Sequence, residues 1–288
     1  MTNALRLFLV TFLVMVAFAA NSVLGRLGLI GTEIGAGSFA LVRLVSGAAM
    51  LGLICLLLRK RIAGSWRGGA ALLAYAGFFS YAYIALPAGM GAVILFALVQ
   101  FTMLGWGLAN GELLSGRQWA GFSIAAAALV WLVSPGLNAP PLLGAAAMAS
   151  AGIGWGVYSL LGRGVTDPTA ATTGNFMRAT LLALPILGAT IWFAPEPMPP
   201  GDGVMIAVAS GAITSGLGYV VWYQVVRHLS ASRAGIAQLS VPALAAIGGV
   251  LFLSEPVTLR FALSTAAILG GVGLAVLTRT PGSSKATE

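Results

Sequence analysis

Long apolar stretches separated by short polar segments dominate this chain. Residues 7–25 carry no charge, and the longer uncharged intervals 68–111 and 118–162 each hold enough residues for two membrane-crossing helices. A helix needs about 20 apolar residues to cross a bilayer. The turn residues at Pro87 and at 135–141 divide the two long intervals. Because a charge in the bilayer core is costly, the intervals between charges define the spans.

Ten spans follow from this pattern. They lie near residues 4–26, 35–58, 68–86, 88–110, 117–134, 142–162, 168–193, 203–227, 231–252 and 258–277. Two of them carry one arginine each, Arg43 and Arg178, inside an otherwise apolar stretch. Since only helices and closed barrels satisfy their backbone groups in lipid, we expect an all-α integral membrane protein.

The composition agrees with a lipid environment. Hydrophobic residues make up 59% of the 288 residues and charged residues 8%, whereas soluble domains contain about 25% charged residues. So few charges cannot cover the surface of a protein of this size in water. The 39 glycines are typical of helices that pack closely within a membrane.

The basic residues are distributed unevenly between the two sides of the predicted membrane. With a cytoplasmic N-terminus, eleven of the 15 lie on the cytoplasmic side, two lie outside and two lie within spans. This positive-inside pattern predicts that both termini, including the tail 279–288, are cytoplasmic, in a bacterial inner membrane. It also explains the net charge of +8 without nucleic-acid binding.

The two halves of the chain resemble each other. Three pairs of segments match: 18–26 with 155–163, 39–43 with 174–178, and 112–117 with 255–260. The last pair is separated by 143 residues (Glu112 to Glu255). Because each half has five spans, an odd number, the second copy must be inverted. We therefore expect two inverted five-helix repeats, 1–135 and 142–278, a transporter arrangement with the substrate site between the repeats.

The second half carries the most specific motifs. Tyr223, the segment 225–231, Pro242 and the segment 252–255 resemble the aromatic-Ala-Leu, Pro and Leu-Gly-Glu pattern of the EamA-type transporters of the drug/metabolite transporter superfamily. Residues 41–44 are similar to the second-helix arginine motif of that family. The resemblance extends over residues 7–277.

This resemblance implies a ten-helix secondary transporter with its fifth and tenth helices at the periphery. The aromatic-rich spans are most similar to bacterial exporters of aromatic and other neutral amino acids, with export of drugs or other metabolites as the alternative. The first copy departs from the family pattern, with Val99 in place of the proline and Phe18 where tryptophan is frequent.

Polar and aromatic side chains in the middle of the spans are the candidate substrate contacts. They are Asn21, Tyr75, Phe78, Phe79, Gln100, Trp155, Tyr158, Tyr219, Tyr223 and Gln238. Several share a helical face at three- and four-residue spacing. A cavity lined by them would bind an amphipathic, amino acid-like solute. The alternative is that they only pack helices together.

Arg43 and Arg178 permit two interpretations. An arginine deep in a span faces the protein interior and can hold a substrate carboxylate. Alternatively, both bond to helix-end carbonyls in their own repeats. The presence of one arginine in each copy favours this structural role.

Other functional classes lack the residues they need. The one histidine, His228, lies at a helix end, Cys55 is the one cysteine, and no serine nucleophile motif occurs, so we expect neither an intramembrane enzyme nor a metal or other cofactor. The segment 35–40 fits G-x-G-x-x-A but follows no strand. A channel would need a ring of charges or a carbonyl filter. The sequence leaves the oligomeric state open.

No Asp or Glu lies inside a predicted span. Proton-coupled carriers place a titratable group in the pathway, and arginine does not deprotonate. We therefore expect facilitated diffusion or exchange that is insensitive to a pH gradient. The alternative is that Glu112 or Glu255 reaches inward from its helix end and titrates.

Overall fold

The computed structural model describes residues 3–226, 228–229 and 231–277, which contain helices and no strand. The helices are α1 Asn3–Gly31, α2 Ala36–Leu57, α3 Trp66–Tyr83, α4 Ala88–Ala109, α5 Gly116–Val133, α6 Leu142–Leu161, α7 Pro168–Phe193, α8 Gly201–Val208, the π-helix η1 Ala209–Leu217, α9 Gly218–Val226, α10 Ala231–Leu253 and α11 Leu259–Leu277.

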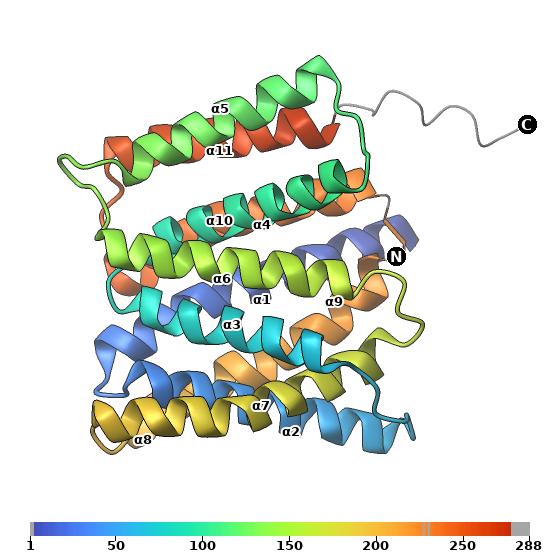
Figure 1. Ribbon diagram of the computed structural model, residues 1–288, viewed down its shortest axis with the longest axis vertical. Helices are drawn as coiled ribbons and strands as arrows, with labels where there is room; N and C mark the ends of the chain where they lie inside the picture. The colour runs from blue at the N-terminus through green and yellow to red at the C-terminus, as the bar shows by residue number, and fades with distance from the viewer. Residues whose placement is uncertain (1–2, 227, 230, 278–288) are drawn as a thin grey trace, which may run out of the picture.

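The helices of the described part form ten rods, because α8, η1 and α9 follow one another without a break (Figure 1). Nine of the rods end within a few residues of the predicted spans. The largest difference is in α1, which continues to Gly31 instead of ending near residue 26. The π-helical stretch inside the eighth rod was not expected.

Six rods are long and apolar enough to cross a membrane by length and composition alone. They are α1, α2, α4, α6, the continuous rod of α8, η1 and α9, and α11. The other four, α3, α5, α7 and α10, lie in the same bundle (Figure 1). Two of these four contain a proline, Pro185 in α7 and Pro242 in α10.

Local sequence explains several helix ends. Ser115 and Gln118 form a capping box at the start of α5, each accepting a hydrogen bond from the backbone N–H of the other. Ser65 accepts a hydrogen bond from the Gly68 N–H at the start of α3. The start of α2 depends instead on a distant residue, because the Gly37 and Ser38 N–H groups donate to the Glu196 carboxylate at 2.8 and 2.9 Å.

Helices of one half pack mainly on helices of the other half. The contacts include α2 with α7 and η1, α3 with α6 and α7, α4 with α6 and α10, α5 with α11, and α1 with α8, η1, α9 and α10. The helices α5 and α11 approach each other closely, because a Cβ added to Gly121 would lie 2.5 Å from the Gly271 carbonyl oxygen, and the converse also holds. This pair forms the layer at the top of Figure 1, at the edge of the bundle.

The buried positions of α5 recur in α11. Gln118, Gly121, Ala125, Ala128 and Leu132 are buried, and so are the residues 143 positions later, Phe261, Ser264, Ile268, Gly271 and Ala275. Corresponding faces of the two helices are therefore buried.

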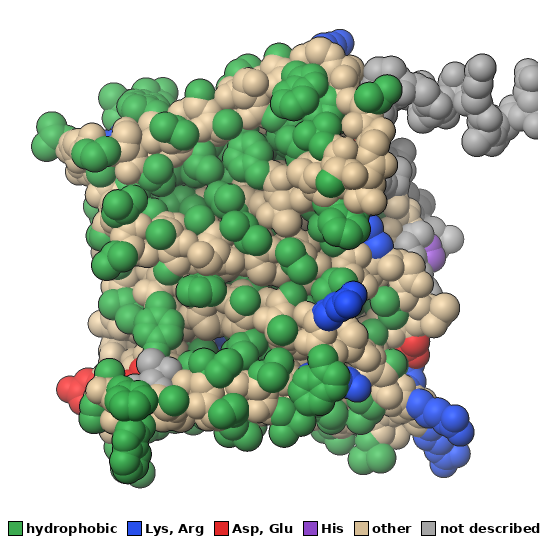
Figure 2. Space-filling model, in the orientation of Figure 1, with side chains coloured by type: hydrophobic (Ala, Val, Ile, Leu, Met, Phe, Trp, Pro, Cys, Tyr) green, Lys and Arg blue, Asp and Glu red, His purple; other side chains and the backbone are tan. Residues whose placement is uncertain are grey.

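The rods run side by side between two ends of the molecule (Figure 1). We call the end that holds Arg26, Glu196 and Glu255 the Arg26 end, and the opposite end, which holds Glu112 and Arg163, the Arg163 end. Figure 2 shows apolar side chains over the middle of one face and Lys and Arg side chains gathered along its right edge, which is the Arg163 end. An apolar band with charges at its edges suits a bilayer.

Candidate substrate-binding site

Arg43 of α2 is a guanidinium buried within the bundle. The residue is 1% exposed. Its Nη2 donates to the Tyr75 hydroxyl at 2.8 Å and to Ser215 Oγ at 3.3 Å. The guanidinium carbon lies 4.4 Å from the ring centre of Phe79 and 4.9 Å from that of Tyr75, which favours the cation. Its Nη1, however, has no hydrogen-bond partner, and an unsatisfied buried donor is costly.

Asn21 of α1 joins the same cluster to η1. Its Nδ2 donates to the Tyr75 hydroxyl at 3.1 Å, and its Oδ1 accepts from Ser210 Oγ at 2.7 Å and Thr214 Oγ1 at 3.1 Å. π-Helical stretches are frequent at functional sites. Polar side chains from α1, α2, α3 and η1 therefore meet in one place.

Aromatic rings surround these polar groups. Trp155 of α6 lies 5.0 Å from Tyr75, 5.4 Å from Tyr158 and 4.9 Å from Tyr219, measured between ring centres. Tyr75 lies 5.4 Å from Phe79. Three helices, α3, α6 and α9, contribute these five side chains. We call them, together with Arg43, Asn21, Ser210, Thr214 and Ser215, the central cluster.

The expectation that Phe78 shares this face is wrong. Phe78 is 46% exposed, whereas Tyr75 and Phe79 are buried. Successive residues on a helix point about 100° apart, so Phe78 turns away from the face that Tyr75 and Phe79 present to the cluster.

Three other candidates lie outside the central cluster. Tyr223 lines a cavity near the end of α9. Gln100 of α4 and Gln238 of α10 are half-buried, and within the described residues neither makes a hydrogen bond to the cluster.

Arg178 has surroundings unlike those of Arg43. Its Nη1 donates to the carbonyls of Ala63 at 2.8 Å and Gly174 at 3.0 Å, and its guanidinium carbon lies 5.7 Å from the Trp66 ring centre. These bonds suit a structural role, although Ala63 belongs to the other half of the chain. Arg43 makes no such bond to a carbonyl in the described part of the chain.

The sequence did not single out Ser210, Thr214 and Ser215. The signal was present in the sequence, because a six-residue stretch inside an apolar span contains these three hydroxyl side chains. Serine and threonine also bond to their own helix backbone, as Thr214 does with the Ser210 carbonyl. Their presence in the span therefore did not identify a site.

A cavity of about 260 Å³ opens at the Arg163 end. It is lined by the loop between α2 and α3 and by residues of α6, α7 and α9, including Tyr158, Thr172, Asn175 and Tyr223. The Tyr158 hydroxyl donates to Thr172 Oγ1 at 3.4 Å. Because Tyr158 also contacts Trp155, it belongs to both the cavity wall and the central cluster.

An ion pair lies at the Arg26 end. Arg26 Nε lies 3.2 Å from Glu255 Oε1, and both side chains are mostly buried. Arg26 Nη1 donates to the carbonyls of Tyr83 and Ile84 at 2.9 Å each. Glu255 Oε2 accepts from the Ala88 N–H at 2.8 Å, the first residue of α4, where the helix dipole favours an anion. We call Arg26, Glu255 and the start of α4 the Arg26 latch.

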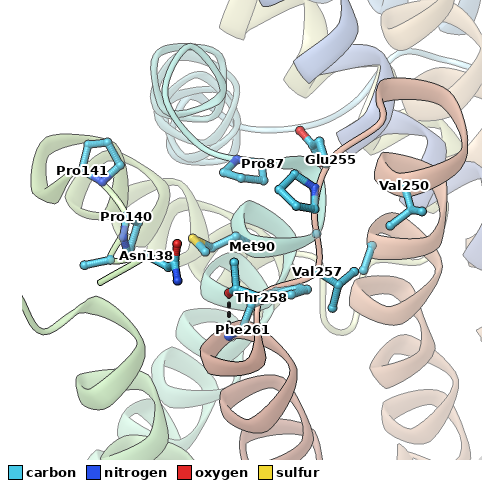
Figure 3. A pocket seen from close by; sticks show the side chains of 14 residues that line it. Pro87, Met90, Asn138, Pro140, Pro141, Val250, Glu255, Val257, Thr258 and Phe261 are labelled. Atoms are coloured by element: carbon cyan, nitrogen blue, oxygen red, sulfur yellow. Dashed lines mark hydrogen bonds between the residues drawn. The ribbon is translucent and has the colours of Figure 1, made fainter. Parts of the chain in front are cut away.

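A hollow of about 200 Å³ lies beside the latch. Figure 3 shows Glu255 and Pro87 on one side of it, Asn138 and Pro140 on another, and Phe261 below, where its N–H donates to Thr258 Oγ1. None of its lining residues belongs to the central cluster.

The repeat counterparts of the latch residues are arranged differently. Glu112 and Arg163 are both exposed. Among the described residues no ion pair joins them, and the Glu112 carboxylate accepts no hydrogen bond. The residues that match Arg26 and Glu255 in sequence therefore lack the contacts of the Arg26 latch.

Metal-binding side chains do not gather in the described residues, where no group of three or more His, Cys, Asp or Glu could hold an ion. Cys55 is buried, with its Sγ 3.1 Å from Thr173 Oγ1.

Comparison with known proteins identifies the family. Residues 142–277 match the model of the EamA-like transporter family. A Pseudomonas aeruginosa protein described as "Uncharacterized protein PA1977" is 48% identical over 278 residues, 95% of this chain and 96% of that protein. The chain belongs to the EamA-like transporter family. This EamA-like protein is therefore a multi-pass membrane transporter of small solutes.

A solved crystal structure is also similar to this EamA-like transporter. It has a TM-score of 0.64 at 18% identity, and the match covers 94% of this chain and 97% of that one. At this identity the likeness shows a shared fold alone.

Proposed function

We propose that this EamA-like protein is a secondary carrier that works by alternating access between two inverted five-helix repeats. The difference between its ends supports this mechanism most directly. The Arg26 latch is paired and mostly buried, while the matching residues Glu112 and Arg163 are exposed, and Arg163 directly follows the cavity-lining Gly162. A carrier must have one end closed while the other is open.

Two features support the inverted repeat. The buried faces of α5 and α11 match at a spacing of 143 residues. The contacts between halves are also reciprocal: α4 packs on α6 as α1 packs on α10, and α3 packs on α7 as α2 packs on η1. Each of these contacts between the halves is therefore matched by a second contact between the corresponding helices. This correspondence is expected when a pseudo-twofold axis relates the halves.

In the opposite state a second latch forms at the Arg163 end. Glu112 and Arg163 correspond to Glu255 and Arg26, and α10 begins at Ala231, 143 residues after Ala88 begins α4. We propose that Glu112 then pairs with Arg163 and accepts a hydrogen bond at the start of α10, while the Arg26 latch opens. The change of state would break the charge-assisted bonds of one latch and form those of the other. Neither state is therefore strongly favoured.

The central cluster is the proposed substrate site. Its rings suit an apolar body and its hydroxyl, amide and guanidinium groups suit a polar end. Aromatic and apolar amino acids are the first class to test, and drugs or other metabolites are the alternative. With the basic Arg163 end in the cytoplasm, the cavity faces inward and the carrier serves export across a bacterial inner membrane.

Transport is proposed to follow the substrate gradient. The described acidic residues lie at helix ends or in loops, and Glu255 bonds to Arg26 and α4 rather than reaching the central cluster. Guanidinium groups remain charged. A proton therefore has no carboxylate to bind beside Arg43.

Counterflow in proteoliposomes tests the carrier. Liposomes loaded with unlabelled amino acid should take up the labelled compound transiently and saturably, at a rate unchanged by a pH difference at zero membrane potential. Uptake without saturation would indicate a channel. A several-fold acceleration by the pH difference that is lost in Glu112→Gln or Glu255→Gln would overturn the coupling proposal.

Cysteine accessibility tests the mechanism. In a Cys55→Ala background, a single cysteine placed beside Arg26 and, in a second variant, beside Arg163 should react with a membrane-impermeant reagent in turn, with substrate shifting the two in opposite directions. If both react fully under all conditions, alternating access is wrong.

A further inference from the structure

We infer that the central cluster binds an organic carboxylate of net negative charge, with an aromatic or apolar body, in preference to a zwitterionic amino acid. The inference rests on the proposed function, since it names the class of solute for that same site.

The first reason is an uncompensated positive charge. Arg43 is buried, and within the described residues no carboxylate contacts it. The six acidic residues described all lie elsewhere: Glu33, Glu112 and Asp202 are exposed, and Asp167, Glu196 and Glu255 bond to other partners. A guanidinium stays protonated, and an unpaired buried charge is costly. An anionic ligand would supply the missing counter-charge.

The second reason is an unpartnered buried donor. Arg43 Nη1 has no acceptor. The Tyr75 hydroxyl accepts from both Arg43 Nη2 and Asn21 Nδ2. A carboxylate has two acceptor oxygens and no donor, and hydrogen bonds between ionised groups are the strong ones. Arg43 Nη1 can therefore donate to a carboxylate oxygen beside Tyr75.

The third reason is the absence of an anionic partner for an ammonium group. Asn21 Oδ1, an amide acceptor in the cluster, already accepts from Ser210 and Thr214. An amino acid would bring its ammonium group close to the Arg43 guanidinium. In place of an anionic partner, aromatic ring faces would have to offset the repulsion between these two cations. The expected order of affinity is carboxylate anion, then zwitterion, then amine cation.

Three matched compounds test this order. 3-Phenylpropionate is phenylalanine without the ammonium, and phenethylamine is phenylalanine without the carboxylate. Isothermal titration calorimetry measures equilibrium binding to the purified full chain in detergent. Unlike a transport assay, this measurement is not affected by passive permeation of the weak acid through a membrane. We expect 3-phenylpropionate to bind at least about tenfold more tightly than phenylalanine, and phenethylamine not to bind. Equal or tighter binding of phenylalanine, or competition by phenethylamine, would overturn the inference.

Variants locate the ligand. Arg43→Gln should lower the affinity for 3-phenylpropionate at least about tenfold, whereas Arg178→Gln, its repeat counterpart, should leave the affinity unchanged. Tyr75→Phe keeps the ring and removes the hydroxyl, so a several-fold loss there tests the site even if Arg43→Gln does not fold. Unchanged affinity in the folded variants would contradict the assignment.

The inference and the carrier proposal fail in different ways. If phenylalanine shows saturable counterflow while 3-phenylpropionate does not bind, the carrier stands and the anion assignment is wrong. If 3-phenylpropionate binds through Arg43 while no solute of the set exchanges across proteoliposomes, the anion assignment stands and the carrier proposal is wrong.

Discussion

At the Arg26 end, Glu255 bonds to Arg26 and to the first N–H of α4, whereas at the Arg163 end the matching Glu112 and Arg163 are exposed and unpaired among the described residues. The two ends have the same residue types at matching positions, so the difference lies in their tertiary contacts. In a chain of two similar halves, one conformation can complete the contacts of one end alone. In the proposed carrier, the unpaired set would stabilise the opposite conformation.

The largest effect is expected from a covalent lock on the Arg26 latch. Arg26→Cys with Glu255→Cys, in a Cys55→Ala background, should lose at least about nine-tenths of its counterflow when a short bifunctional thiol reagent joins the pair, because a carrier needs both ends to open. A reagent cleavable by reductant should restore transport. The same treatment of either single cysteine variant is the control, and full transport by the locked protein would show that this end need not open.

Neutralising one carboxylate at a time should shift the carrier in opposite directions. Glu255→Gln removes charge-assisted bonds to Arg26 and α4 worth roughly 1.5–3 kcal/mol, a shift of about tenfold or more in favour of an open Arg26 end. Glu112→Gln is the matched control, and it should favour a closed Arg26 end instead. The accessibility of a cysteine beside each latch measures both shifts. Shifts in the same direction would contradict the two-latch interpretation.

The Glu196 cap should affect stability without shifting this balance. Its carboxylate accepts from the Gly37 and Ser38 N–H groups at the start of α2, and loss of a cap costs about 0.5–2 kcal/mol. Glu196→Gln should therefore lower the unfolding temperature in detergent by roughly 2–4 °C per kcal/mol. Cysteine accessibility at both ends should stay as in the parent protein, and a shift there would assign Glu196 to the latch.

The smallest effect is expected at the Arg163 end, from Lys60 and Asp167. Lys60 donates to Asp167 Oδ1 at 2.9 Å, which lowers the pKa of Asp167 below its usual range. A carboxyl group with a lowered pKa stabilises the fold above its unfolded pKa, and this stabilisation is lost as pH falls through the folded value. Asp167→Asn should thus lower the unfolding temperature slightly at neutral pH, because the pair is partly exposed to solvent.

The pH dependence distinguishes this ion pair from a purely steric effect. The difference in unfolding temperature between Asp167→Asn and the parent should shrink as pH falls below about 4. A difference that stays constant down to that pH would show that the carboxylate charge is not its cause.

Much of the fold could be predicted because a charge in lipid is costly wherever it lies in the chain. The intervals between charged residues placed nine of the ten rods within a few residues, and Pro87 and Pro141 correctly divided the long apolar intervals. The extension of α1 to Gly31 was missed because Arg26, taken as a span boundary, bonds to Glu255 and to backbone carbonyls inside the bundle.

The candidate site could be predicted only in part. Tyr75, Phe79, Trp155, Tyr158 and Tyr219 were named from the sequence and do converge, but Phe78 was named by the same spacing rule and does not. Spacing along a helix defines which residues share a face. It does not define which part of that face meets another helix, because apolar burial does not drive helix association in lipid.

By itself the sequence determined the helical class, the approximate spans and the match between the halves, since these depend on the local balance of apolar, charged and turn-forming residues. Only the tertiary structure decided that Arg43 enters the central cluster while Arg178 bonds to carbonyls, and that Glu255 is paired while Glu112 is exposed. These contacts join residues as far apart as 229 positions, as in the pair of Arg26 with Glu255. Equivalent residues of the two halves share their local sequence, so the close packing of distant helices gives them different partners.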